Sequence, residues 1–92
     1  MNEARAIDLA DRIVSIMKDK RKKADTFLVE TLPTARIPAF GITLEGLSSK
    51  PPWKTLMDRL ADNGYQLVTV KLNAVRGRAD LTEILVGVQK HG

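Results

Sequence analysis

The sequence of 92 residues contains no cysteine, one histidine, two phenylalanines, one tryptophan and one tyrosine. Without cysteine, disulfides, thiolate metal sites and cysteine nucleophiles are all excluded. The histidine, His91, is followed only by the C-terminal Gly92. A side chain so close to a chain end is a poor general base or metal ligand. We therefore expect no metal, no cofactor and no catalytic activity.

Long apolar stretches are also lacking. Runs such as Ile84–Val86 are far too short to span a bilayer. The charged residues 1–8 leave no room for the apolar segment of a signal peptide. A cytoplasmic protein without membrane contacts is the expectation. A hydrophobic content of 43% predicts a single α+β domain over residues 1–92, with one modest core.

The acidic residues do not form a catalytic pattern. Two pairs have helical spacing, Asp8 with Asp11 and Asp58 with Asp62. Acids at this spacing on an exposed helix face typically pair with neighbouring basic residues. The glycines likewise lack the spacing of a phosphate-binding loop. We expect a binding protein that is not an enzyme.

The net charge of +4 comes from a single segment. Residues 18–23, Lys-Asp-Lys-Arg-Lys-Lys, contain five basic groups and one acid, and the remaining chain has ten of each sign. Such a cluster suits the negative C-terminal end of a helix. It also suits contact with phosphates. Both interpretations stay open at this point.

The first half of the chain predicts a helix followed by a strand. Asn2 is a candidate N-cap for a helix over Glu3–Lys23. Its apolar stripe has spacings of three and four and comprises Ala6, Ile7, Ala10, Ile13, Val14 and Met17. Thr26–Leu32 has the β-branched and aromatic composition of a strand, which ends at Pro33.

The middle of the chain predicts strand, helix and strand. Residues 39–45 alternate, with Phe40, Ile42 and Leu44 on one face. Ser48 or Ser49 then caps a helix that ends at Asn63–Gly64. The apolar face of this helix comprises Trp53, Leu56, Met57 and Leu60. The next strand covers Tyr65–Leu72, and short joints of this kind favour a right-handed crossover between two parallel strands.

The last segment is a strand or a helix. Residues 73–80 are too many for a two-residue hairpin turn. Leu81–Gln89 contains β-branched residues around Gly87, which favours a strand over a helix capped by Asp80. As a strand it pairs antiparallel with the strand over Tyr65–Leu72. One face of this pair of strands is then turned to the helices. The residues on that face are Val68, Val70 and Leu72, opposite Ile84, Val86 and Val88.

The predicted order is αββαββ, a two-layer sandwich. Two helices cover one face of a four-stranded, mainly antiparallel sheet. This order of elements resembles a ferredoxin-like sandwich that is circularly permuted so that its first strand comes last. The resemblance concerns the order of elements and implies no function.

Two basic segments are candidate contacts for nucleic-acid phosphates. Their residues are Lys18, Lys20, Arg21, Lys22 and Lys23 in the cluster, with Arg76 and Arg78 in the loop 73–80. Aromatic residues that could stack on bases are scarce, because Phe40 and Trp53 both fall on predicted core faces. A protein that contacts the phosphate backbone fits better than one that reads bases.

The open face of the predicted sheet suggests a second kind of partner. Tyr65, Leu67 and Leu85 fall on the face away from the helices and form an apolar patch suited to a homodimer or a protein partner. Leu28 and Leu32 of the first strand are possible extensions of this patch. The sequence thus supports two hypotheses. The first is a small non-catalytic module that contacts nucleic-acid phosphates through a basic helix end and a loop. The second is a protein-interaction, inhibitor or structural module that uses the open sheet face.

Overall fold

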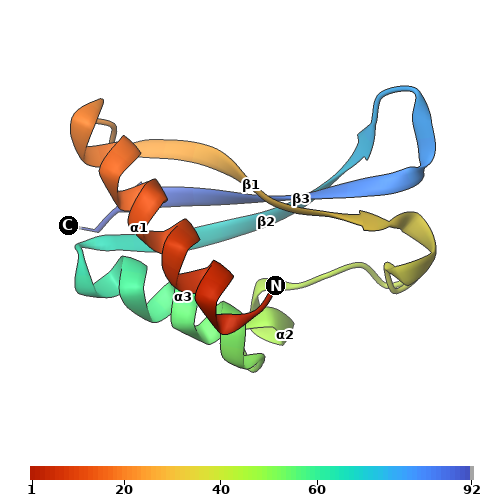
Figure 1. The fold of residues 1–92 in the computed structure, drawn as a ribbon, viewed down its shortest axis with the longest axis horizontal. Coiled ribbons are helices and arrows are strands. Elements are labelled where there is room, and N and C mark those ends of the chain that lie inside the picture. Colours follow the sequence, from red (N-terminus) through yellow and green to blue (C-terminus); the bar gives the residue numbers. More distant parts are fainter. Residues whose placement is uncertain (92) are drawn as a thin grey trace.

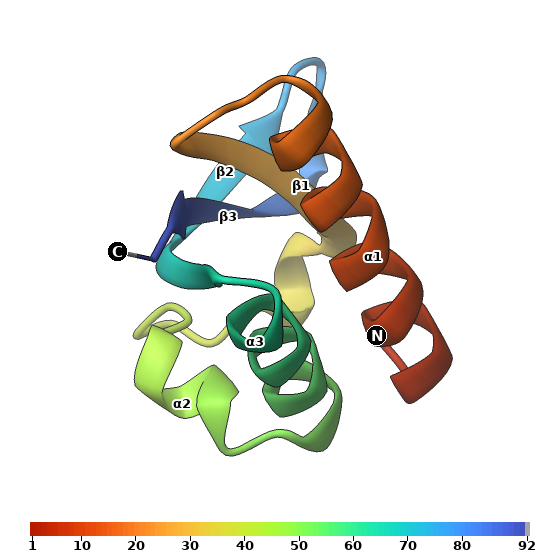
Figure 2. The ribbon, with the colours of Figure 1, turned by 90° about the vertical axis from the view of Figure 1, so that its left-hand side faces the viewer.

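The computed structural model describes residues 1–91 of the chain. Within this range the helices are α1 (Glu3–Asp19), α2 (Leu44–Ser48), α3 (Pro51–Asp62) and the short 3₁₀ helix η1 (Thr34–Arg36). The strands are β1 (Ala24–Pro33), β2 (Tyr65–Val75) and β3 (Arg78–Lys90). They form an antiparallel sheet in the order β1-β3-β2, and α1 and α3 pack side by side on one of its faces (Figures 1 and 2).

The α+β architecture is confirmed, and so are most of the predicted elements. Helix α1 begins where the sequence indicates, because the Asn2 side chain accepts a hydrogen bond from the backbone N–H of Arg5 at 2.8 Å. The C-terminal segment is a strand and not a helix. Its buried residues alternate along β3 and are Thr82, Ile84, Val86 and Val88.

The expected strand over residues 39–45 is wrong. Pro38 accepts a hydrogen bond from Gly41 N at 2.8 Å, which closes a turn, and Gly41 has a positive φ of 83°. Thr43 then caps α2 by accepting a hydrogen bond from Gly46 N at 3.0 Å. Because this turn and cap replace extended backbone, Phe40 is 86% exposed and does not lie on a core face.

The loss of that strand changes the topology. Within residues 1–91 the sheet has three strands, so the expected four-stranded sheet and αββαββ order are not found. The expected right-handed crossover between parallel strands over residues 39–45 and 65–72 is absent from this range as well, because residues 39–45 form no strand. The permuted ferredoxin-like outline, which requires four strands, is therefore not confirmed.

Two helix ends differ from the expectation. Helix α1 ends at Asp19 and not at Lys23, because the chain turns at Lys20 and Arg21. Helix α3 has Lys50 at its N-cap position without a side-chain hydrogen bond, so neither Ser48 nor Ser49 caps it. The two serine hydroxyls instead donate to carbonyls one turn earlier in α2. The C-terminal end of α3 is as predicted, with Gly64 at a φ of 86°.

The β2–β3 connection is shorter than the sequence suggested. Strand β2 continues to Val75, strand β3 starts at Arg78, and only Arg76 and Gly77 form the turn. Residues 79–81 belong to β3 but have no partner in β2. They form an irregularity there, because Ala74 pairs with Thr82 and Val75 with Arg78. The result is a long hairpin that projects at one end of the molecule (Figure 1).

The core lies between the helices and the sheet. Helix α1 contributes its predicted stripe except for Ile7, which is 38% exposed, and Ile13 and Met17 are at most 1% exposed. Helix α3 contributes Trp53, Leu56 and Leu60, and α2 adds Leu47. Burying a leucine or isoleucine of this kind stabilises the fold by roughly 1.5–3 kcal/mol. The sheet completes the core with Val29, Tyr65, Leu67, Ile84, Val86 and Val88.

Candidate nucleic-acid interface and partner surface

The basic cluster lies where α1 ends and β1 begins, at the left of Figure 1. The helix closes with a pair of hydrogen bonds typical of a Schellman motif. Lys22 N donates to Met17 O at 2.9 Å, and Arg21 N donates to Lys18 O at 3.2 Å. All the basic side chains of residues 18–23 are exposed. The turn thus displays them at one end of the molecule.

Arg21 has an unusual backbone conformation. Its φ is 50°, and within residues 1–91 it is the one residue other than glycine with a positive φ. It occupies the position after the helix end where glycine is preferred, because a side chain there costs about 1–2 kcal/mol. Strained residues of this kind tend to cluster at functional sites.

Lys90 joins the cluster from the far end of the sequence. Its backbone N–H donates to Lys23 O at 2.8 Å, which ties the end of β3 to the start of β1. We call residues 18–25 together with Lys90 the basic end. It contains six basic and two acidic side chains, a net charge of +4, and the rest of the chain has nine of each sign. The whole formal charge of the protein therefore lies at this end.

One cation of the basic end is engaged by a neighbouring acid. Lys22 Nζ lies 3.1 Å from Asp25 Oδ2. Asp25 Oδ1 also accepts the backbone N–H of Thr26 at 2.8 Å. This backbone hydrogen bond and the Lys22 side chain hold the pKa of Asp25 below its usual range. Within residues 1–91 no ion pair engages Lys18, Lys20, Arg21, Lys23 or Lys90.

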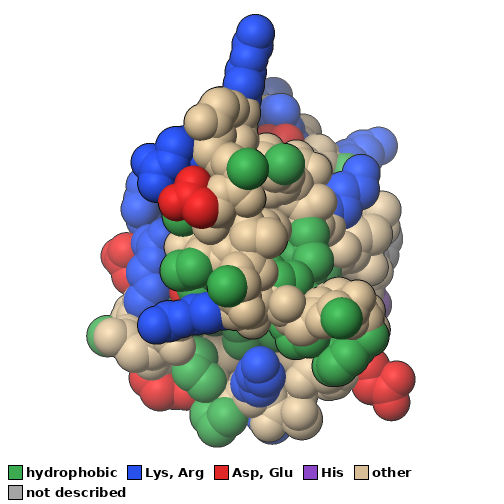
Figure 3. Space-filling model, turned by 90° about the vertical axis from the view of Figure 1, so that its right-hand side faces the viewer, with side chains coloured by type: hydrophobic (Ala, Val, Ile, Leu, Met, Phe, Trp, Pro, Cys, Tyr) green, Lys and Arg blue, Asp and Glu red, His purple; other side chains and the backbone are tan. Residues whose placement is uncertain are grey.

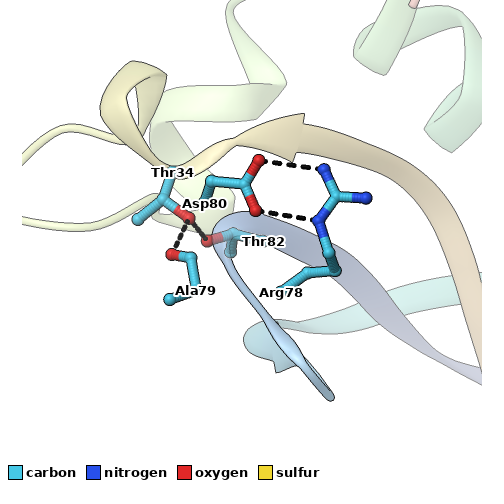
Figure 4. Close-up of polar contacts among 5 residues, drawn as sticks. All are labelled: Thr34, Arg78, Ala79, Asp80 and Thr82. Atoms are coloured by element: carbon cyan, nitrogen blue, oxygen red, sulfur yellow. Dashed lines mark hydrogen bonds and ion pairs between the residues drawn. The ribbon is translucent and has the colours of Figure 1, made fainter.

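The other predicted basic site is the tip of the β2–β3 hairpin. Arg76 is exposed in the turn, but Arg78 forms a bidentate pair with Asp80, with Nε–Oδ1 at 3.0 Å and Nη2–Oδ2 at 2.9 Å (Figure 4). The Arg78 guanidinium lowers the pKa of Asp80. Nearby, Thr34 Oγ1 donates to Ala79 O at 3.2 Å, which ties η1 to the hairpin. The tip therefore presents one uncompensated cation.

The two basic sites do not form one patch. The hairpin tip and the basic end lie at opposite ends of the longest dimension, which is 36 Å (Figure 1). Figure 3 shows the hairpin end, where apolar side chains occupy the middle and Lys and Arg side chains are scattered around them. The structure thus separates Arg76 and Arg78 from residues 18–23.

The predicted apolar partner surface is also changed. Tyr65 and Leu67 are 5% and 9% exposed and belong to the core, so their placement on the open face is wrong. The cause is a bulge at Val68, since Leu67 pairs with Val88 and Thr69 with Gly87. The extra residue reverses the alternation of β2 at this point. Leu85 does lie on the open face, opposite Leu28 of β1.

Sequence reasoning missed two contributors to these surfaces. Lys90 lies 67 positions from Lys23, and only the strand pairing brings them together. The second is the exposed Phe40, which lines a small apolar pocket of about 230 Å³ with Ile42 and Leu47. Leu28, expected as a possible extension of the apolar patch, is 46% exposed on the open face opposite Leu85. Leu32, the other expected extension, is instead partly buried against the core.

In residues 1–91 no three His, Asp or Glu side chains are grouped closely enough to hold a metal ion. Nor does any helix in this range have the length and apolar character needed to cross a membrane. No protein-family model, curated protein or solved structure matches the chain. Functional inference therefore rests on the surfaces described above.

Proposed function

We propose that the protein is a small non-catalytic module that binds the phosphate backbone of nucleic acid through its basic end. One observation carries the proposal: the entire net charge of +4 lies on residues 18–25 and Lys90. Duplex DNA presents one negative charge per about 1.7 Å of helix axis, so a compact cationic surface gains by releasing its counterions.

The conformation of Arg21 supports this proposal. A glycine would end α1 with less strain, so the arginine at a φ of 50° is retained at a local cost. An anion-binding role for its guanidinium accounts for that cost. Four other cations form no ion pair within residues 1–91, and they surround the same turn or lie on the adjoining strand end: Lys18, Lys20, Lys23 and Lys90.

The surroundings favour phosphates over bases or lipid. Nucleobase readers use exposed aromatic side chains, and the aromatic residue nearest the basic end in sequence, Phe27, is half-buried against the core. Membrane-surface binders insert large apolar side chains. The large exposed apolar side chains found in residues 1–91 are Ile7, Leu28 and Phe40, and none belongs to the basic end. Sequence-independent contact with the backbone is the binding mode that remains.

The test is the salt dependence of binding to labelled duplex DNA, single-stranded DNA and RNA of mixed sequence. Five unpaired cations predict that the logarithm of affinity falls with that of salt at a slope between about −3 and −5 on duplex. The variant Lys20→Gln/Arg21→Gln/Lys23→Gln should flatten that slope by about 2.7, since each lost phosphate contact contributes about 0.9.

A matched control removes the same charge elsewhere. The variant Arg36→Gln/Lys50→Gln/Arg76→Gln also loses three exposed cations, none of them at the basic end. It should retain the slope of the unmodified protein. Equal losses in the two variants would mean that overall charge, and not the basic end, drives binding. The absence of binding at low salt would overturn the proposal.

A further inference from the structure

The sheet face opposite α1 and α3, here called the outer face, is covered by no segment of residues 1–91 (Figure 2). Its central strand is β3, whose outward residues alternate with the buried Ile84, Val86 and Val88. A sheet needs cover on only one face in a protein of this kind, but the uncovered face is then normally rich in polar and charged residues.

The outer face has two apolar cross-strand pairs, with Thr31 and Glu83 between them, and few charges. Leu28 lies directly across from Leu85, and Pro33 directly across from Leu81. Leu28 is 46% exposed although it lies near the middle of β1. The neighbouring outward residues of the paired strands are uncharged except for Lys71 and Glu83.

Lys71 and Glu83 give the face a net charge of zero. Lys71 pairs with Leu85 and Asn73 pairs with Glu83, so the two charged residues are diagonal neighbours on adjacent strands. Neither takes part in an ion pair within residues 1–91. In a two-fold symmetric interface, a contact between residues i and j occurs twice with the roles exchanged. A second copy can therefore offer its Glu83 to Lys71 and its Lys71 to Glu83.

The strand edges are less suited to association than the face. Strand β1 has a bulge at Val29, whose carbonyl accepts a hydrogen bond from Arg5 Nη2 at 3.4 Å. On the same strand the Asp25 carboxylate accepts a hydrogen bond from the backbone N–H of Thr26, so this N–H is not free to pair with a further strand. Strand β2 has its own bulge at Val68. Bulges and charged side chains on edge strands oppose the addition of a further strand.

The area of the outer face is sufficient for a weak dimer. Three strands spaced by about 4.8 Å and paired over about nine residues make a face of roughly 14 by 30 Å. Two such faces bury about 1,000 Å² in total once side-chain relief is included, which is the lower bound for a specific interface. Interfaces at this lower end of the size range are typical of weak, transient association.

We propose that the outer face binds the outer face of a second copy, in a two-fold symmetric dimer held by the Leu28–Leu85 pair and by reciprocal Lys71–Glu83 pairs. This surface lies apart from the basic end, and the proposal does not depend on nucleic-acid binding. Neutrality distinguishes a second copy from a charged partner, because two like faces of zero net charge meet without repulsion.

The test is sedimentation equilibrium of the full chain from low micromolar to millimolar concentration. The unmodified protein should pass from monomer to dimer within this range. Lys71→Glu and Glu83→Lys should each weaken the dimer by at least about tenfold, since each places like charges across the two-fold axis. Both side chains are on the surface, so the fold should be retained, which circular dichroism would verify.

Mixing the two variants gives the decisive measurement. Lys71→Glu protein presents only acids at these positions and Glu83→Lys protein only bases, so a heterodimer should form where neither variant dimerises alone. The double variant Lys71→Glu/Glu83→Lys should recover the homodimer. A monomer at every concentration would overturn the proposal. So would a dimer indifferent to both charge reversals, because its interface would lie elsewhere.

Discussion

Gly87 lies directly across from Thr69 in the β2–β3 ladder, and the Thr69 hydroxyl fills the space that a Cβ atom at Gly87 would need. The bulge at Val68 creates this close approach, since it turns both Val68 and Thr69 toward Gly87. Gly87→Ala should therefore reduce the free energy of unfolding by about 1–3 kcal/mol, the usual cost of overpacking. Thermal denaturation would measure it as a fall in Tm of about 4–8 °C per kcal/mol.

The companion variant is Thr69→Ala. It removes the obstructing oxygen and leaves the Thr69 Cβ 3.6 Å from the new methyl group, an ordinary contact. In that background Gly87→Ala should no longer destabilise the protein, and it should stabilise it by about 0.5–1 kcal/mol because glycine is unfavourable within a strand. A double-mutant cycle without coupling between the two sites would contradict the described register.

The parts of the fold that the sequence predicted correctly have strong local patterns. The stripe of α1 recurs every three or four residues, and the alternation of β3 covers four buried positions from Thr82 to Val88. Each pattern specifies both the element and the face that it buries. The α+β architecture and the helices over one sheet face follow from these patterns.

The errors arise where turn chemistry or a bulge overrides alternation. Phe40, Ile42 and Leu44 alternate as a strand would, but Gly41 and the Thr43 cap impose a turn and a short helix. One inserted residue at Val68 moves Leu67 into the core. A single bulge leaves no clear trace in a sequence, and it reverses the face of every residue on one side of it.

The candidate sites show the same limit. Residues 18–23 form a visible run of charge, and their exposure is a local consequence of the helix end. The contribution of Lys90 to the basic end depends on how β3 pairs with its neighbours, and so does the separation between the basic end and Arg78. Such long-range relationships cannot be obtained from one sequence without alignment or structure.

Replacing Arg21 with glycine should stabilise the protein and weaken nucleic-acid binding. Glycine adopts the left-handed conformation without strain, which raises the free energy of unfolding by about 1–2 kcal/mol. Its greater freedom in the unfolded chain offsets about half of that gain. The net gain of about 0.5–1 kcal/mol corresponds to a rise in Tm of about 2–8 °C. Arg21→Ala is the matched control, because it loses the guanidinium but keeps the strain. It should weaken binding equally without raising Tm.

Neutralising Asp25 should strengthen binding. Asp25→Asn removes one negative charge, frees Lys22 and retains an oxygen that can accept the Thr26 N–H. The salt dependence on duplex DNA should steepen by about 0.9 as Lys22 gains a phosphate contact. Asp80→Asn similarly frees Arg78, but at the hairpin tip. It should leave the affinity nearly unchanged, and an equal gain from both variants would argue against a site confined to the basic end.

The exposed position of Phe40 gives a direct test of the topology. Phe40→Ala should change the free energy of unfolding by less than about 0.5 kcal/mol, because the side chain is 86% exposed and its removal leaves no buried cavity. Leu47, a few residues later in α2, is 3% exposed, and Leu47→Ala should cost about 2–5 kcal/mol. Urea denaturation of both variants makes the comparison. If residues 39–45 formed a fourth strand with Phe40 in the core, Phe40→Ala would instead cost about 3–5 kcal/mol, because it would leave a cavity.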